Sequence, residues 1–365
     1  MKKFGILFML LFTLTVSAQS DFEIAKEFMS KKGVKLAPNE RSTTRGTDVP
    51  YSIFNGENDK GFCIVANGKV VGYDYENTIG INDMPCCFKE LLEMYSKTTS
   101  ISKTRGNVDY FPLRNTTPIA PLLTTHWGQT SPYNDLLEKK KGICVLVAWC
   151  QILHYFRVPQ TLKDYVVNDT LTLPITYFDH DKMLDKYDKN ATDEEKYEVA
   201  KLFYYYQTID IYGILEYFGL EVFEKNPLDE NYYYNFNNQR DSLLEEGIPI
   251  WSVGGNHAFI IDGRDSEGRY HINMGWSGSS DGYYALPDNR DERDASLGHA
   301  YGAAVPIYFK PVSFNWSYSG TSNIGNIISK TNNENVYNLQ GRKVGNSLEG
   351  LPKGVYIQNG KKVIK

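Results

Sequence analysis

The spacing of apolar residues changes along this chain and divides it into a helical part and a strand-rich part. Residues 144–156 are apolar on nearly every side, which predicts a buried helix that Pro159 ends. From about Gly247 onward, glycine-rich turns separate short apolar segments, which predicts strands over 248–253, 258–261, 269–273, 283–286 and 303–309. Helices first and an antiparallel sheet afterwards indicate the α+β class.

Capping signals predict two further helices. Residues 20–23 form a capping box for a short helix that ends near Gly33, and residues 192–195 form another for a helix that runs through Tyr206. The glycosylation-like sequence at residues 190–192 is therefore interpreted as part of a helix cap.

The region after the first helix has its own strand and helix signals. Asn67-Gly68 joins two apolar runs within residues 61–73, which predicts a hairpin. A helix is expected around residues 88–95, and the polar run 96–107 is predicted to be an exposed linker. Residues 19–116 are thus predicted to form a small α+β unit.

The C-terminal end differs in composition from the rest. Residues 312–330 are rich in serine, asparagine and glycine and are predicted to be a linker. Residues 331–365 are predicted to form a small β tail, with strands at 336–339 and 354–357 and a turn at Asn359-Gly360.

Length and charge exclude some classes of protein. A chain of 365 residues is too long for one compact core, so several domains are expected. A net charge of -5 gives no basic footprint for nucleic acid.

The first residues resemble a secretory signal. Lys2 and Lys3 precede an apolar stretch from Phe4 to Val16 that is too short to cross a membrane, and Ala18 completes a cleavage site. We therefore expect residues 1–18 to be a signal peptide, the protein to be secreted or at the cell surface, and no transmembrane segment.

Cys144 is the first candidate for chemistry. The chain has five cysteines, and Cys144 and Cys150 lie six residues apart on one predicted helix, so they face different sides and should not pair. A helix N-terminus favours the thiolate, which suits a nucleophile at Cys144. A buried, inert cysteine is the structural alternative, and it fits Cys150 better.

His257 is the second candidate, although a lone histidine beside a strand is more often structural. Gly254 and Gly255 allow close approach of a substrate or a backbone. The strand that returns after the turn is expected to bring Asn273 and Trp276 opposite His257. Asn273 would then orient the imidazole, and Trp276 would shield it from water.

Gln129 lies fifteen residues before Cys144. A side-chain amide beside the backbone N–H of the nucleophile would stabilise a tetrahedral oxyanion. Gln129 is therefore a candidate for the oxyanion hole. Zinc-protease, phosphate-loop and serine-elbow motifs are absent from the sequence.

These segments together resemble streptopain-like cysteine peptidases, which form peptidase family C10 of the papain-like clan. The family pattern is matched by 129–134, by the spacing within 144–151, by the Asn-Met-Gly-Trp-Ser-Gly segment at 273–278, and by a Gly-Gly-His-Ala-Phe segment at 254–259 in which one extra residue, Asn256, precedes His257. Isoleucine at position 143 and methionine at position 274 depart from it.

The resemblance implies a papain-like fold, with the nucleophile on a helix packed against an antiparallel sheet. It also implies an inhibitory propeptide over 19–116, a catalytic domain over 117–311 and no metal or cofactor. The tail at 331–365 resembles a type IX secretion sorting domain, which adds secretion machinery as a partner.

The sequence therefore predicts a secreted cysteine endopeptidase made as a zymogen. Cys144 and His257 would form a catalytic dyad that hydrolyses protein or peptide substrates through a thioester, with the propeptide as intramolecular inhibitor. Two alternatives stay open: a catalytically degenerate surface binding protein with the same fold, and an acyl transferase of the transglutaminase type.

Overall fold

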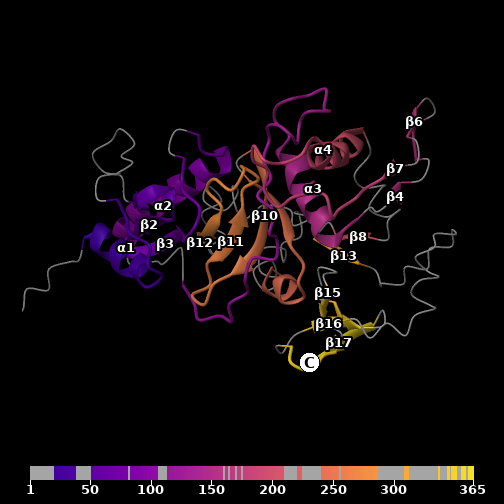
Figure 1. The fold of residues 1–365 in the computed structure, drawn as a ribbon. Helices are drawn as coiled ribbons and strands as arrows, with labels where there is room; N and C mark the ends of the chain where they lie inside the picture. Colours follow the sequence, from indigo (N-terminus) through magenta and orange to yellow (C-terminus); the bar gives the residue numbers. More distant parts are fainter. Residues whose placement is uncertain are drawn as a thin grey trace, which may run out of the picture.

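Figure 1 shows the fold in a computed structural model of the chain. The structure describes residues 20–37, 51–80, 83–105, 113–158, 161–162, 165–168, 171–173, 176–208, 220–223, 240–254, 256–286, 308–311, 336–337, 343–345, 347–351, 355–358 and 361–365. The predicted signal peptide and the predicted linker at 312–330 lie outside the described residues.

One antiparallel sheet runs through the centre of the molecule. Its seven strands lie in the order β1-β2-β3-β12-β11-β10-β9. The strands span, in that order, Tyr51–Asn55, Phe62–Ala66, Lys69–Asp74, Gly282–Tyr284, Tyr270–Asn273, His257–Arg264 and Ile250–Gly254. Helices together with an antiparallel sheet confirm the predicted α+β class.

The hairpin between β2 and β3 is confirmed. Its turn residues Asn67 and Gly68 both have positive φ, at 53° and 68°, which is the geometry that an Asn-Gly hairpin turn requires.

The N-terminal unit joins the second half of the chain through this sheet. Tyr283 of β12 pairs with Tyr73 of β3, and the N–H of Ala285 donates to the carbonyl oxygen of Val71 at 2.7 Å. In Figure 1 the sheet therefore continues from β3, in the indigo-to-purple N-terminal unit, to the orange β12. The two predicted units share a sheet and do not fold around separate ones.

Two helices belong to the N-terminal unit, with a short 3-10 turn at Glu57–Asp59. Helix α1 spans Asp21–Ser30, and the Ser20 side chain accepts from the N–H of Glu23, so the predicted cap is present. Helix α2 spans Cys86–Arg105, so the prediction of a linker from residue 96 was wrong. The helix continues because this polar run holds no glycine or proline to end it before Arg105.

Helix α3, Cys144–Phe156, packs against β10 on one face of the sheet, and helix α4, Asp193–Thr208, packs against α3. The predicted capping box of α4 is present, because Thr192 and Glu195 exchange hydrogen bonds. The apolar residues of α3 form one core with those of α4 and with alternate residues of β10.

The second core, on the other face, mixes residues from both halves of the chain. Phe62 and Phe88 of the N-terminal unit are fully buried with Ile272, Met274 and Tyr284 of the strand-rich part. The N-terminal unit therefore covers apolar surface that would otherwise face water.

Three short strand pairs lie outside the main sheet. They are β4 (Thr161–Leu162) with β7 (Thr176–Tyr177), β5 (Tyr165–Asn168) with β6 (Leu171–Leu173), and β8 (Leu220–Phe223) with β13 (Tyr308–Pro311). The predicted strand at 303–309 is described only from Tyr308, and it pairs outside the main sheet.

The C-terminal residues form a separate four-stranded sheet, and two of its strands overlap the segments predicted at 336–339 and 354–357. It contains β14 (Val336–Tyr337), β15 (Lys343–Gly345), β16 (Val355–Gln358) and β17 (Lys361–Ile364). Within the part of the chain that the structure describes, none of the helices has the length and apolar character needed to span a membrane.

Candidate active site

Cys144 is the first residue of α3, at the end of an irregular segment. Gly142 has φ +67° and Ile143 takes the N-cap position with φ -100°, so the chain turns sharply just before the helix. Cys144 is half-buried, whereas Cys150 of the same helix is fully buried. Burial raises the pKa of the Cys150 thiol well above its ordinary value, which fits the packing role expected for this residue.

The imidazole of His257, the first residue of β10, acts on the Cys144 thiol. Burial acts to raise the pKa of the Cys144 thiol. Interactions with the His257 side chain and with the backbone of Ala258 and Val145 outweigh burial, so the pKa of Cys144 lies below its ordinary value. The structure thus brings together the two predicted residues, and their geometry favours a thiolate.

The second nitrogen of His257 is held by a backbone group. Nε2 lies 2.7 Å from the carbonyl oxygen of Met274. Because a carbonyl oxygen can only accept, Nε2 carries the proton and Nδ1 is the nitrogen left for the thiol. Met274 thereby fixes both the tautomer and the orientation of the ring.

Trp276 lies against the imidazole of His257. The two ring centroids are 5.6 Å apart at an interplanar angle of 70°, an edge-on contact. The indole Nε1 of Trp276 donates to Asp83 of the N-terminal unit at 3.4 Å. Shielding of His257 from water by this ring stays a prediction.

The Asn273 side chain does not touch His257, so its predicted direct contact is wrong. Asn273 pairs with Ile260 in the ladder, and side chains alternate along β10, so Asn273 and His257 point to opposite faces of the sheet. The amide of Asn273 instead donates to the carbonyl of Thr125 at 2.7 Å and forms two hydrogen bonds with Gln151, at 3.1 and 3.2 Å.

Asn273 nevertheless acts on the histidine through one peptide group. Its Oδ1 accepts from the N–H of Gly275 at 3.0 Å. That N–H belongs to the same peptide unit as the Met274 carbonyl that binds His257. Asn273 therefore orients the acceptor of the imidazole proton, not the imidazole itself.

Gln129 lies beside the start of α3. Its Oε1 accepts from the backbone N–H of Ile143 at 3.1 Å, which fixes the orientation of the amide. The Nε2 group remains as a donor next to the helix N-terminus, where the N–H of Cys144 also lies. This arrangement suits an oxyanion hole.

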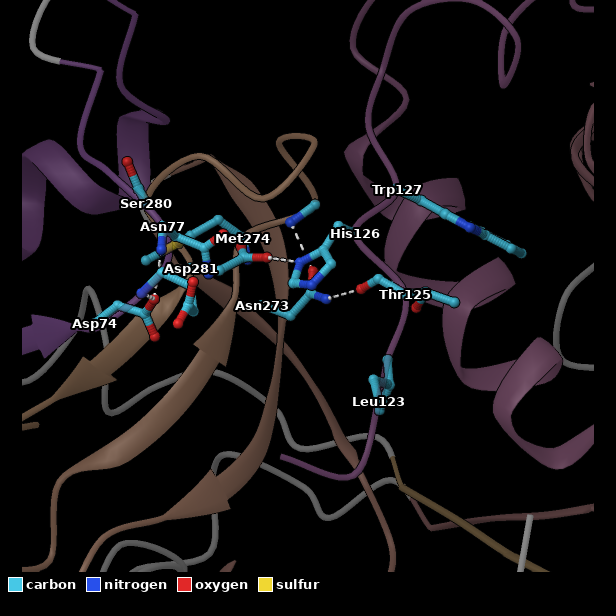
Figure 2. A network of polar contacts seen from close by, with 12 residues as sticks. Asp74, Asn77, Leu123, Thr125, His126, Trp127, Asn273, Met274, Ser280 and Asp281 are labelled. Carbon is cyan, nitrogen blue, oxygen red and sulfur yellow. Dashed lines mark hydrogen bonds and ion pairs between the residues drawn. The ribbon is translucent and has the colours of Figure 1, made fainter. Parts of the chain in front are cut away.

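Sequence reasoning missed two further groups, which Figure 2 includes. The carboxylate of Asp281 accepts from the N–H of Met274 at 2.7 Å and lies 3.1 Å from Nδ1 of His126. Asp281 stands in the segment Gly278-Ser279-Ser280-Asp281-Gly282, which reads as a turn, so its spacing carried no signal.

Among the residues that the structure describes, no group of three or more His, Cys, Asp or Glu side chains has the arrangement of a metal site.

The geometry agrees with comparisons to known proteins. Residues 127–284 match the peptidase C10 family. Streptopain from Streptococcus pyogenes serotype M28 (strain MGAS6180) is 25% identical over 295 residues, which cover 65% of this chain and 73% of streptopain. The thiol protease/hemagglutinin PrtT of Porphyromonas gingivalis is 22% identical over 361 residues, which cover 80% of this chain and 41% of that protein.

A solved structure has the same fold. A mutant fragment of Prevotella intermedia prointerpain A matches with a TM-score of 0.56 and 21% identity, covering 76% of this chain and 98% of the fragment. The match extends over more of the chain than the segment at 127–284. It therefore supports an α+β fold in which an N-terminal unit accompanies the catalytic one.

Proposed function

We propose that the chain is a secreted cysteine endopeptidase of the C10 family, in which Cys144 is the nucleophile and His257 the general base. One observation carries this assignment: the thiol at the start of α3 has a pKa that His257 lowers, and the Nε2 of that histidine is already bound to the Met274 carbonyl. This is the arrangement that thiol catalysis needs, because the thiolate is the nucleophile.

The proposed reaction proceeds in two steps. The thiol proton moves to Nδ1 of His257, and the sulfur attacks the carbonyl carbon of the scissile peptide bond. The oxyanion accepts hydrogen bonds from Gln129 and from the N–H of Cys144. The C–N bond breaks as His257 returns the proton to the leaving amine, and a thioester remains. Water then gives a proton to His257 and attacks the thioester, which releases the carboxylic acid product and restores the thiol.

The N-terminal unit is proposed to be a propeptide that controls this site. Three of its groups contact the loop after β11: Cys87 lies 3.7 Å from the sulfur of Met274, Asp83 accepts from Trp276, and the carbonyl of Thr78 accepts from the N–H of Ser280 at 3.0 Å. This loop provides the Met274 carbonyl that accepts from His257 and the Trp276 ring that lies against its imidazole. A unit bound at this loop can hold the enzyme as a precursor.

Export is the finer part of the proposal. It rests on the signal-like residues 1–18 and on the small C-terminal sheet, which is proposed to address the protein to type IX secretion machinery. Expression with and without residues 331–365, followed by cell fractionation, tests this part. Equal amounts of the two forms outside the cell would contradict a sorting role.

Activity is tested with purified full-length chain, casein and reductant. We expect cleavage of casein and shortening of the precursor by the wild type, and neither by Cys144→Ala. Cys86→Ser is the matched control, because Cys86 is exposed on α2 and should be dispensable. Casein left intact by a folded wild type would contradict the proposal and favour a binding protein. Amine incorporation into glutamine side chains without backbone cleavage would favour an acyl transferase.

A further inference from the structure

A buried carboxylate lies behind the catalytic histidine. The side chain of Asp281 is fully buried. One oxygen accepts from the N–H of Met274 at 2.7 Å, and the other lies 3.1 Å from Nδ1 of His126. Met274 is also the residue whose carbonyl binds His257. Asp281 therefore binds the backbone N–H of Met274, while the carbonyl oxygen of the same residue binds the imidazole.

His126 connects this loop to the other half of the site. It stands three residues before Gln129, in the segment that leads to the oxyanion donor. The same segment meets the loop again, because the carbonyl of Trp127 accepts from the N–H of Ser277 at 3.1 Å. A Cβ atom at Gly128 would lie only 2.1 Å from the Ser277 hydroxyl oxygen, so the two segments are in close contact. Figure 2 labels residues from both segments around Asp281.

The two groups need each other. An unpaired carboxylate in a fully buried position is costly, so Asp281 requires the donors that face it. The hydrogen bond to Asp281 raises the pKa of His126, against the opposing effect of its partial burial. Lys186 and His271 lower the pKa of His126. Asp281 also raises the pKa of Asp74, which belongs to the N-terminal unit.

We propose that Asp281 and His126 form a positioning pair that fixes the Met274 carbonyl against His257 and locks that loop to the segment bearing Gln129. The pair touches neither substrate nor the reacting atoms. Its role rests on the proposed function, because it acts through His257 and Gln129. A negative charge beside Met274 also strengthens the electrostatic support for the imidazolium that forms during the reaction.

The test starts from the full chain; once the N-terminal unit has been removed, only Cys144 and Cys150 remain, and iodoacetamide reports on Cys144 because Cys150 is buried. Each variant is matured by a tagged wild-type enzyme that is then removed. Asp281→Ala is compared with Ser280→Ala. Ser280 is the neighbouring residue, and its hydroxyl is buried without a hydrogen-bond partner among the described residues. Two readouts follow: kcat and KM for a peptide that the wild type cleaves, and the alkylation rate of Cys144 against pH.

Misplacement of a catalytic group by about 1 Å can cost on the order of 100-fold in rate. We therefore expect Asp281→Ala to lose about 10- to 100-fold in kcat with little change in KM. The alkylation profile of Cys144 should move to higher pH, toward that of an ordinary thiol. Ser280→Ala should match the wild type in both readouts. A folded Asp281→Ala protein with unchanged kcat and an unchanged profile would overturn the proposal.

His126 provides the second variant in case Asp281→Ala does not fold, because its side chain is 35% exposed. His126→Leu should repeat both changes, and His126→Gln, which keeps a donor, should restore most of kcat. Wild-type behaviour of His126→Leu would overturn the pair. A wild type that neither cleaves peptide nor alkylates below the pH of an ordinary thiol would contradict the proposed function itself, and the role of the pair with it.

Discussion

The imidazole of His257 donates from Nε2 to the backbone carbonyl of Met274, over 2.7 Å. A backbone acceptor makes the orientation of the catalytic base depend on the conformation of a loop and not on the identity of one side chain. The Met274 side chain itself points elsewhere, into the core shared with the N-terminal unit, where its sulfur lies 3.7 Å from that of Cys87.

Substitution of Met274 should therefore separate stability from catalysis. Met274→Leu keeps the backbone acceptor and nearly the same volume, so we expect kcat within a few-fold of the wild type and a stability loss below about 1.5 kcal/mol. Met274→Ala leaves a cavity in the shared core, so the free energy of unfolding should fall by about 2–5 kcal/mol. Urea denaturation of the Cys144→Ala precursor, which cannot process itself, measures the stability of each variant. A large loss of kcat in Met274→Leu would contradict the backbone assignment.

Asn273 and Gln151 should act as one unit. Their amides are buried and exchange two hydrogen bonds, and Gln151 also accepts from the hydroxyl of Thr125 at 2.8 Å. Replacing either one with alanine leaves buried polar groups unpaired, so each should cost about 1–3 kcal/mol of stability. The double variant should cost less than the sum of the two, with a coupling of about 0.5–3 kcal/mol. Strict additivity in a denaturation cycle would exclude this coupling.

Signals within a few residues of each other predict the two reactive side chains. The contacts between segments that are distant in sequence could not be predicted in this way. Cys144 and His257 were predictable because a buried helix and a glycine-flanked strand begin at them, and both signals lie within a few residues. The role of Asn273 depended on strand register. A simple hairpin count places it near His257, but the alternation of side chains along β10 turns the two to opposite faces.

No nearby sequence pattern predicts the role of Asp281 or the pairing of β3 with β12. Asp281 follows two serines in a turn, and only the folded loop brings it to Met274. The register of β3 with β12 rests on two residue pairs, Tyr283 with Tyr73 and Tyr284 with Gly72, contributed by segments that are about two hundred residues apart. Hydrophobic periodicity predicts that such strands exist but does not identify their partners.

Gln129 offers a clean test of the oxyanion hole. Gln129→Ala removes a donor to the tetrahedral intermediate, so we expect kcat to fall by about 100- to 1000-fold with KM little changed. Alkylation of Cys144 by iodoacetamide forms no oxyanion and should keep its wild-type rate. Thr130→Ala, at the exposed neighbouring position, is the control. If alkylation slows as much as peptide cleavage does, Gln129 acts by holding the start of α3 through Ile143, and the oxyanion assignment is wrong.

Processing should occur before Leu113. The segment that follows is already bound to the catalytic sheet: Arg114 donates from its N–H to Glu267, Thr116 to Ser266, and Ile119 exchanges two hydrogen bonds with Arg264. Such paired backbone resists a protease, because cleavage requires an extended and accessible chain. We expect the mature N-terminus between Arg105 and Leu113, as measured by N-terminal sequencing and intact mass. A mature form that begins after Ile119 would contradict this prediction.

The buried pair of His271 and Asp262 should give stability that depends on pH. Nδ1 of His271 lies 2.6 Å from Asp262. Burial lowers the pKa of His271, but Asp262, Asp281 and Asp74 together raise it above its ordinary value. A raised pKa in the folded state means that protonated His271 stabilises the fold below its unfolded pKa of about 6.5. This contribution is lost as the pH rises through the folded pKa.

In urea denaturation of the Cys144→Ala precursor, stability should therefore fall as the pH rises above about 6.5. His271→Gln, which cannot titrate, should flatten that fall, and equal slopes in the two proteins would show that His271 is not the group responsible.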